Sequence, residues 1–210
     1  MKSFEAFGKI LAIVFHPLFM VMYFTIYLSL AAGFSPLGDV LTILFCVFFF
    51  TVLLPGATTY FLREDIQMSD RKKRSLPIGF TIVSYIACYF VLSYFKTNFT
   101  NIFIIGVLVI FIIGLSLIWI INKWYKISMH GTGIGAIFPV ILYFLYFACI
   151  SHSWRTIIAN FIILFFGILV LFQRVLSRAH SKNEVLSGFA LGAGISFSLF
   201  YFLEKSIQIN

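Results

Sequence analysis

Charged residues are scarce in this sequence, and long stretches contain none. Only 10% of the 210 residues are charged, whereas 61% are hydrophobic. A soluble domain of this size cannot bury so much apolar surface, so the composition indicates an integral membrane protein. Lysine and arginine number 15 against 7 acidic residues, and no soluble basic domain exists to carry a duplex. The basic excess therefore favours phosphate groups or lipid headgroups at a membrane surface, and nucleic-acid binding is not expected.

Cysteine is also scarce and shows no paired spacing. Cys46, Cys88 and Cys149 each lie inside an apolar run. They are interpreted as small buried hydrophobic residues, and they predict neither a disulfide nor a metal site.

The N-terminal apolar run has no small-residue cleavage site, so it is assigned to the mature protein. Residues 1–15 are a candidate interfacial helix.

Seven apolar runs make up most of the chain. Each is close to the roughly 20 residues that a helix needs to cross about 30 Å of hydrocarbon. The runs are 17–34, 40–62, 77–95, 101–121, 134–150, 156–172 and 185–203. They predict an all-α fold, a polytopic transmembrane helical bundle of about seven spans that forms a single domain over residues 1–210.

Proline and glycine residues mark particular places in these runs. Pro55 and Gly56 interrupt the second run and predict a kink there, whereas Pro139 is placed in the first turns of the fifth. In the last run, a stripe of small residues is expected to let the helix pack tightly against its neighbours. The stripe consists of Gly188, Ala190, Gly192 and Gly194.

Three connections, 63–77, 123–133 and 173–188, hold nearly all the ionisable residues. Two apolar runs separate each connection from the next, so all three are expected at the same membrane face. In the third connection, Glu184 follows His180 by four residues, and both would share one face of a helix that begins near His180. With Arg174, they could hold a phosphate and attack it. The alternative interpretation is a set of flanking charges that anchors two membrane helices.

These connections resemble three motifs of the type-2 phosphatidic acid phosphatase superfamily of membrane lipid phosphatases, in a short bacterial branch. The third motif is matched by Arg174, His180 and Glu184, with Gln173 in place of serine and glutamate in place of aspartate. The second motif is matched by Ser128-Met129-His130, with Ile127 in place of proline and Met129 in place of glycine.

The first motif of this family is matched least well. The basic residues and the proline of that motif are matched by Arg71, Lys72, Lys73, Arg74 and Pro77. The long spacing between the lysine and the Arg-Pro pair of the family motif is missing. The resemblance covers roughly residues 63 to 200, and it implies a six-helix phosphatase-like core with one additional helix.

The resemblance also implies a chemistry. His180 would attack phosphorus and form a phosphohistidine, Glu184 would orient its imidazole, and His130 would protonate the leaving oxygen. The phosphate would be held by Arg174, Arg71, Arg74, Ser128 and Lys126. Backbone N–H groups near Gly131 could add to this cradle. No metal or cofactor is required. The expected substrates are a lipid phosphate or an isoprenoid diphosphate, and the expected location is a bacterial inner membrane.

Two other classes of protein stay open. A membrane prenyltransferase or terpene cyclase also handles isoprenoid diphosphates, but it needs paired Asp-rich motifs for magnesium, and Asp65 and Asp70 are the only close acids. A non-catalytic protein that binds or transports lipid phosphates is favoured by the departures at Ile127, Met129 and Glu184. Transport would be supported by charges near the middle of the spans, and the apolar runs lack them.

The distribution of basic residues predicts which face carries the motifs. Of the 15 basic residues, 12 fall on the motif side and 3 on the other. The motif side carries Lys2, Lys9, Arg63, Arg71, Lys72, Lys73, Arg74, Lys123, Lys126, Arg174, Arg178 and Lys182, and the other side carries Lys96, Arg155 and Lys205. The positive-inside rule therefore places the three connections in the cytoplasm and the C-terminus outside.

Overall fold

The structure is a computed structural model that describes residues 10, 13–31, 37–62, 72–94, 99–150 and 154–208. The chain divides into two compact units. One unit is His16–Lys126, and the other contains Ile127–Asn210 with the N-terminal residues through Phe15. The described residues contain helices and no strand, which confirms the all-α class. Residues 1–9, 11 and 12, most of the candidate interfacial helix, lie outside the described residues.

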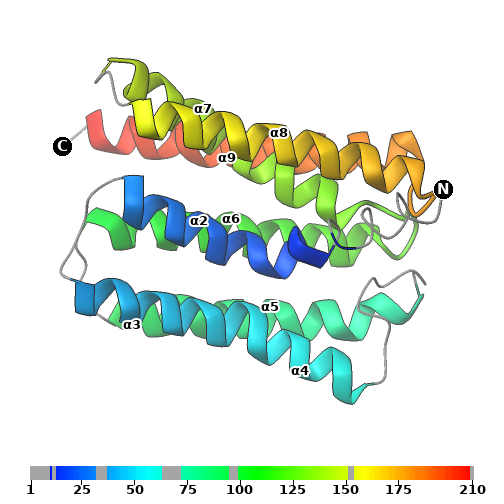
Figure 1. The fold of residues 1–210 in the computed structure, drawn as a ribbon. Helices are drawn as coiled ribbons and strands as arrows, with labels where there is room; N and C mark the ends of the chain where they lie inside the picture. Colours follow the sequence, from blue (N-terminus) through cyan, green and yellow to red (C-terminus); the bar gives the residue numbers. More distant parts are fainter. Residues whose placement is uncertain are drawn as a thin grey trace. The chain divides into compact units, whose positions relative to one another are not determined.

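The first unit is a group of apolar helices (Figure 1). Its elements are α2 (Pro17–Ala31), α3 (Leu37–Phe48), the π-helical η1 (Phe49–Leu53), α4 (Leu54–Phe61), the 3₁₀-helical η2 (Lys72–Arg74), α5 (Ser75–Tyr94) and α6 (Phe99–Ile121). Helix α5 packs against α6, and α2 packs against both α3 and α6. Proline fits the start of α2 because the first helical residue needs no N–H donor.

The second apolar run is helical through Pro55, with a π-helical turn just before the proline. Pro55 has no N–H, and its ring would crowd the carbonyl of Thr51 in a regular α-helix. The chain forms the π-helical segment η1 just before this point, and α4 begins at Leu54 with Pro55 in its first turn. The hydroxyl of Ser84 on α5 donates to the carbonyl of Phe50 inside η1. The irregularity before Pro55 is thus a π-helical turn, and Ser84 on the neighbouring helix satisfies one of its carbonyls.

The second unit contains three long helices that run side by side (Figure 1). They are α7 (Met129–Ile150), α8 (Trp154–Leu176) and α9 (Lys182–Gln208). The predicted start of the fifth run at Ile134 is wrong, because α7 begins at Met129. Pro139 consequently lies inside the helix and not in its first turns. The residues between these two starts include two glycines, Gly131 and Gly133, which weaken the sequence signal for a helix.

Helices α7 and α9 cross at glycines on both sides of the contact. A Cβ atom at Gly131 of α7 would lie 2.6 Å from the carbonyl oxygen of Val185, and one at Gly188 of α9 would lie 2.5 Å from that of Ser128. Gly135 and Gly192 face backbone atoms of the opposite helix just as closely. The two backbones therefore touch over two turns, as small residues allow.

The predicted small-residue stripe is thus correct only in part. Gly188 and Gly192 form the crossing, whereas a Cβ at Gly194 would meet nothing within 4 Å and Ala190 is exposed. The glycines of α7 that complete the crossing, Gly131 and Gly135, were not part of the predicted stripe.

Four helical segments among the described residues are long and apolar enough to cross a membrane. They are Val40–Phe61, Ser75–Tyr94, Ile104–Ile121 and Trp154–Leu176. Shorter apolar helices cover Pro17–Tyr27 and Met129–Tyr143. Helix is present in each of the seven predicted apolar runs. The architecture is that expected of a helical membrane protein.

Candidate functional site

A tight turn carries the chain from α8 to His180. Helix α8 ends at Leu176, and Arg178 has a left-handed backbone conformation with φ of 55°. The N–H of Arg178 donates to the carbonyl of Val175 (3.0 Å), and the N–H of His180 donates to that of Arg174 (3.2 Å). A left-handed conformation is unfavourable for a residue with a side chain, so these backbone bonds hold the turn in place. His180 is thereby fixed directly beside the last turn of α8.

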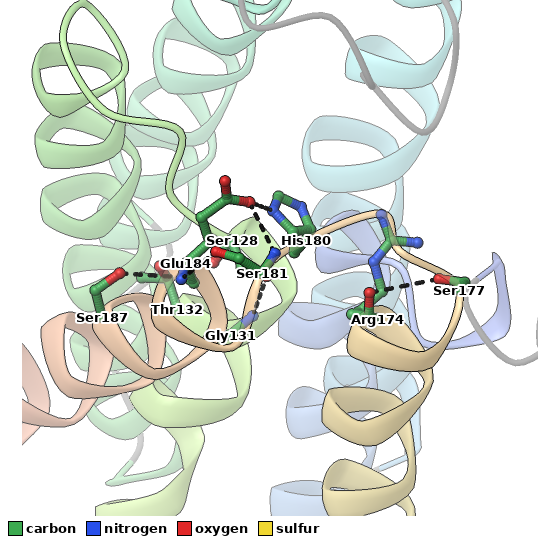
Figure 2. A network of polar contacts seen from close by, with 9 residues as sticks. All are labelled: Ser128, Gly131, Thr132, Arg174, Ser177, His180, Ser181, Glu184 and Ser187. Atoms are coloured by element: carbon green, nitrogen blue, oxygen red, sulfur yellow. Dashed lines mark hydrogen bonds and ion pairs between the residues drawn. The ribbon is translucent and has the colours of Figure 1, made fainter.

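His180 and Glu184 form a short contact at the start of α9. The imidazole Nδ1 lies 2.6 Å from the carboxylate Oε2 of Glu184, and the two side chains are 3% and 18% exposed (Figure 2). Because an ionised carboxylate can only accept, this contact favours the tautomer with the proton on Nδ1 and the lone pair on Nε2. The predicted proximity of the two side chains is confirmed, although His180 itself precedes the helix. The helix begins at Lys182, two residues after His180.

The same carboxylate also caps the helix. The N–H of Glu184 donates to Oγ of Ser181 (3.2 Å), and the N–H of Ser181 donates to Oε2 of Glu184 (3.4 Å). These reciprocal bonds form a capping box. One carboxylate oxygen therefore accepts from the helix cap and contacts His180 (Figure 2). Ser181 is absent from the predicted site, although a Ser-x-x-Glu spacing is a known signature of a helix start.

The start of α7 is attached to the same glutamate. The buried residue Ser128 donates its N–H to the backbone carbonyl of Glu184 (3.1 Å). Its Oγ accepts the N–H of Gly131 (3.1 Å), and its carbonyl accepts the N–H of Thr132 (2.9 Å). Ser128 is therefore the N-cap of α7. His130, the second residue of this helix, is buried beside this junction.

The N–H of Gly131 is committed by this cap. It was expected to be one of the backbone donors to a phosphate, but it donates to the hydroxyl oxygen of Ser128. The N–H of Gly131 therefore stabilises the first turn of α7 and is not one of the expected backbone donors to a phosphate.

Arg174 supplies a buried cation near the two helix starts. It lies in the last turn of α8 and is 3% exposed. Figure 2 shows its side chain rising past the end of α8, beside the loop that leads to His180. A guanidinium there is complementary to an anion, and the partial positive charges at the starts of α7 and α9 act in the same sense.

The predicted site residues are divided between the two units. His130, His180, Glu184, Arg174 and Ser128 belong to the unit that contains α7, α8 and α9. Arg74, which is buried at the end of η2, and Lys126, which is half-buried, belong to the other unit. Arg71 lies outside the described residues. The contacts among Ser128, His180 and Glu184 therefore join only the second and third polar connections, 123–133 and 173–188.

The arrangement combines a basic imidazole nitrogen with positive surroundings. The Nε2 lone pair could attack an electron-poor centre or accept a proton, and Glu184 would stabilise the imidazolium that results. No group of three or more potential metal-ligating side chains was found among the residues that the structure describes. The chemistry that these residues offer is nucleophilic or acid–base chemistry on an anionic group.

Comparisons of the chain with protein-family models, with curated proteins and with solved structures gave no match.

Proposed function

We propose that the chain is an integral membrane phosphatase that hydrolyses a lipid phosphate or an isoprenoid diphosphate through a phosphohistidine. The contact of 2.6 Å between Nδ1 of His180 and Oε2 of Glu184 carries this proposal. A carboxylate on Nδ1 favours the tautomer with a lone pair on Nε2 and raises the basicity of that nitrogen. The buried start of α7, with His130 in its first turn, supplies a second imidazole for proton transfer.

The proposed reaction has two displacements at phosphorus. In the first, Nε2 of His180 forms a bond to phosphorus, the bond from phosphorus to the leaving oxygen breaks, and His130 gives a proton to that oxygen. In the second, water attacks the phosphohistidine, His130 takes a proton from the water, and the bond between Nε2 and phosphorus breaks. Inorganic phosphate is released and both histidines return to their first state. Glu184 offsets the positive charge of the His180 ring throughout.

Cations would hold the equatorial phosphate oxygens during both steps. Arg174 is the proposed ligand within the unit of α7, α8 and α9, and its burial supports this role because a guanidinium binds oxyanions more strongly away from water. Arg71, Arg74 and Lys126 are the further proposed ligands. Ser128 is also a proposed ligand, because its hydroxyl can donate to a phosphate oxygen while its oxygen accepts the N–H of Gly131.

The proposed setting is a bacterial inner membrane crossed seven times. The helices in all seven apolar runs support this number. The three polar connections would then lie at one face, which the excess of basic residues places in the cytoplasm. A polar site at this face could receive a headgroup while the acyl or isoprenoid chain stays among the apolar helices.

Phosphate release by purified protein tests this proposal. The substrates are phosphatidate, phosphatidylglycerol phosphate, farnesyl diphosphate and undecaprenyl diphosphate. The proposal expects release from at least one of them, release that persists with a magnesium chelator, and its loss in His180→Ala. The matched control is Ser198→Ala, which changes an exposed position on α9 and should keep wild-type activity. Binding without release would instead indicate a lipid-phosphate binding protein, and an absolute magnesium requirement would indicate a prenyltransferase-like enzyme.

A further inference from the structure

Two serines cap helices at the candidate site: Ser181 caps α9, directly after the proposed nucleophile His180, and Ser128 caps α7, which carries the proposed acid His130. We propose that Ser181 and Ser128 are positioning residues, Ser181 for His180 and Ser128 for His130. This inference rests on the phosphatase function proposed above. It assigns to each serine a separate effect on the reaction, so the two can be distinguished kinetically.

Ser181 acts on the nucleophile through Glu184. Its hydroxyl oxygen accepts the N–H of Glu184 (3.2 Å), and its own N–H donates to the Oε2 that contacts His180. The capping box therefore sets the side-chain conformation of Glu184, and Glu184 sets the orientation of the imidazole. Aspartate at position 184 would be one methylene shorter. The longer side chain of glutamate allows one carboxylate oxygen to contact both the His180 ring and the N–H of Ser181.

Ser128 acts on the acid through the first turn of α7. Its hydroxyl oxygen accepts the N–H of Gly131, and its carbonyl accepts both the N–H and the hydroxyl of Thr132. His130 lies inside this capped turn. The N–H of Ser128 donates to the carbonyl of Glu184, which ties the turn to the glutamate that holds His180. Loss of the Ser128 hydroxyl would loosen the first turn while this backbone bond remains.

The two roles differ in how they depend on the leaving group. Protonation by His130 matters most when the leaving oxygen is a poor leaving group, as in an alkyl phosphate, and matters little for an acidic phenol. The orientation of His180 matters for both, because Nε2 must attack phosphorus in either case. A defect at Ser128 should therefore change the ratio of the two rates, whereas a defect at Ser181 should lower both rates equally.

The experiment measures phosphate release from dodecyl phosphate and from p-nitrophenyl phosphate by detergent-purified protein. Wild type, His180→Ala, His130→Ala, Ser128→Ala, Ser181→Ala and Ser181→Thr are compared, with Ser198→Ala as the control. We expect Ser128→Ala to lower the rate on dodecyl phosphate roughly 10-fold more than that on p-nitrophenyl phosphate, a weaker form of the pattern in His130→Ala. Ser181→Ala should lower both rates by roughly 5- to 10-fold, and Ser181→Thr should restore them because threonine also caps helices.

The ratio of the two rates does not depend on how much of a preparation is folded, so partial unfolding of Ser128→Ala leaves the test intact. The inference is overturned if Ser128→Ala keeps the wild-type ratio or if Ser181→Ala changes the ratio as strongly as Ser128→Ala. An active wild type with both serine variants behaving like Ser198→Ala would overturn the inference alone. A wild type that releases no phosphate from either these compounds or the lipid panel would overturn the phosphatase function and the inference together.

Discussion

Gly188→Ala should displace the start of α7 from the start of α9. A Cβ atom at this position would lie 2.5 Å from the carbonyl oxygen of Ser128, and an ordinary carbon–oxygen contact is about 3.3 Å, so the two must separate by roughly 0.8 Å. Ser128 also donates its N–H to Glu184 over 3.1 Å, and a shift of this size would stretch that bond beyond hydrogen-bonding distance. The substitution therefore acts on the junction between the two histidines.

The expected magnitude follows from these two losses. Overpacking at a close contact costs about 1–3 kcal/mol, and a broken buried hydrogen bond adds about 1 kcal/mol. The helix propensity of alanine offsets up to about 1 kcal/mol of these losses, so Gly188→Ala should lower the free energy of unfolding by about 1–3 kcal/mol. Its phosphate release should fall by up to roughly 100-fold, the effect of a misplacement near 1 Å.

Gly194→Ala is the matched control, because it makes the same chemical change on the same helix where a Cβ meets nothing within 4 Å. It should leave activity unchanged and stabilise α9 by up to about 1 kcal/mol through helix propensity. Unfolding of both variants in denaturing detergent gives the stability difference, and release of inorganic phosphate gives the activity. Equal stability and equal activity of the two variants would refute the close crossing of α7 and α9.

Three further predictions concern the histidines, the glutamate and the topology. His180→Ala should abolish phosphate release, whereas His130→Ala should lower it by roughly 10²- to 10⁴-fold on alkyl phosphates; small and similar losses in a rate assay would favour a binding protein. Glu184→Asp should lower the rate by roughly 10- to 100-fold, the equivalent of one lost charged hydrogen bond, even though the family that the chain resembles carries aspartate there; a wild-type rate would contradict the shared role of Oε2. A reporter that fluoresces only in the cytoplasm, fused after Asn210, should stay dark, and a bright fusion in inserted protein would contradict the span count or the orientation.

The helices could be predicted from the sequence because long apolar runs leave few alternatives. Each of the seven predicted runs contains helix, and a π-helical turn precedes Pro55, where the proline removes an N–H donor. The start of α7 could not be placed in this way. Apolar periodicity begins at Ile134, whereas the helix is started five residues earlier by the cap at Ser128. Local hydrogen bonds, and not hydrophobicity, determine that boundary.

In the candidate site, contacts between residues close in sequence could be predicted, whereas contacts between different helices could not. The spacing of His180 and Glu184 is a property of one helix start, so four residues of sequence were sufficient to predict their contact. The bond from Ser128 to Glu184 and the contact of Gly131 with Val185 join segments that are more than 50 residues apart. Such pairings depend on how α7 and α9 cross, and composition alone does not indicate which glycines meet.

Direct detection of a phosphohistidine tests the central claim. Purified protein is mixed briefly with a ³²P-labelled substrate from the active panel, quenched in alkali, and digested for mass spectrometry. The account predicts a label that is stable in alkali and labile in acid, located on the peptide that contains His180 and absent from His180→Ala. Rapid phosphate release without such a label, or a label on another residue, would contradict His180 as the nucleophile.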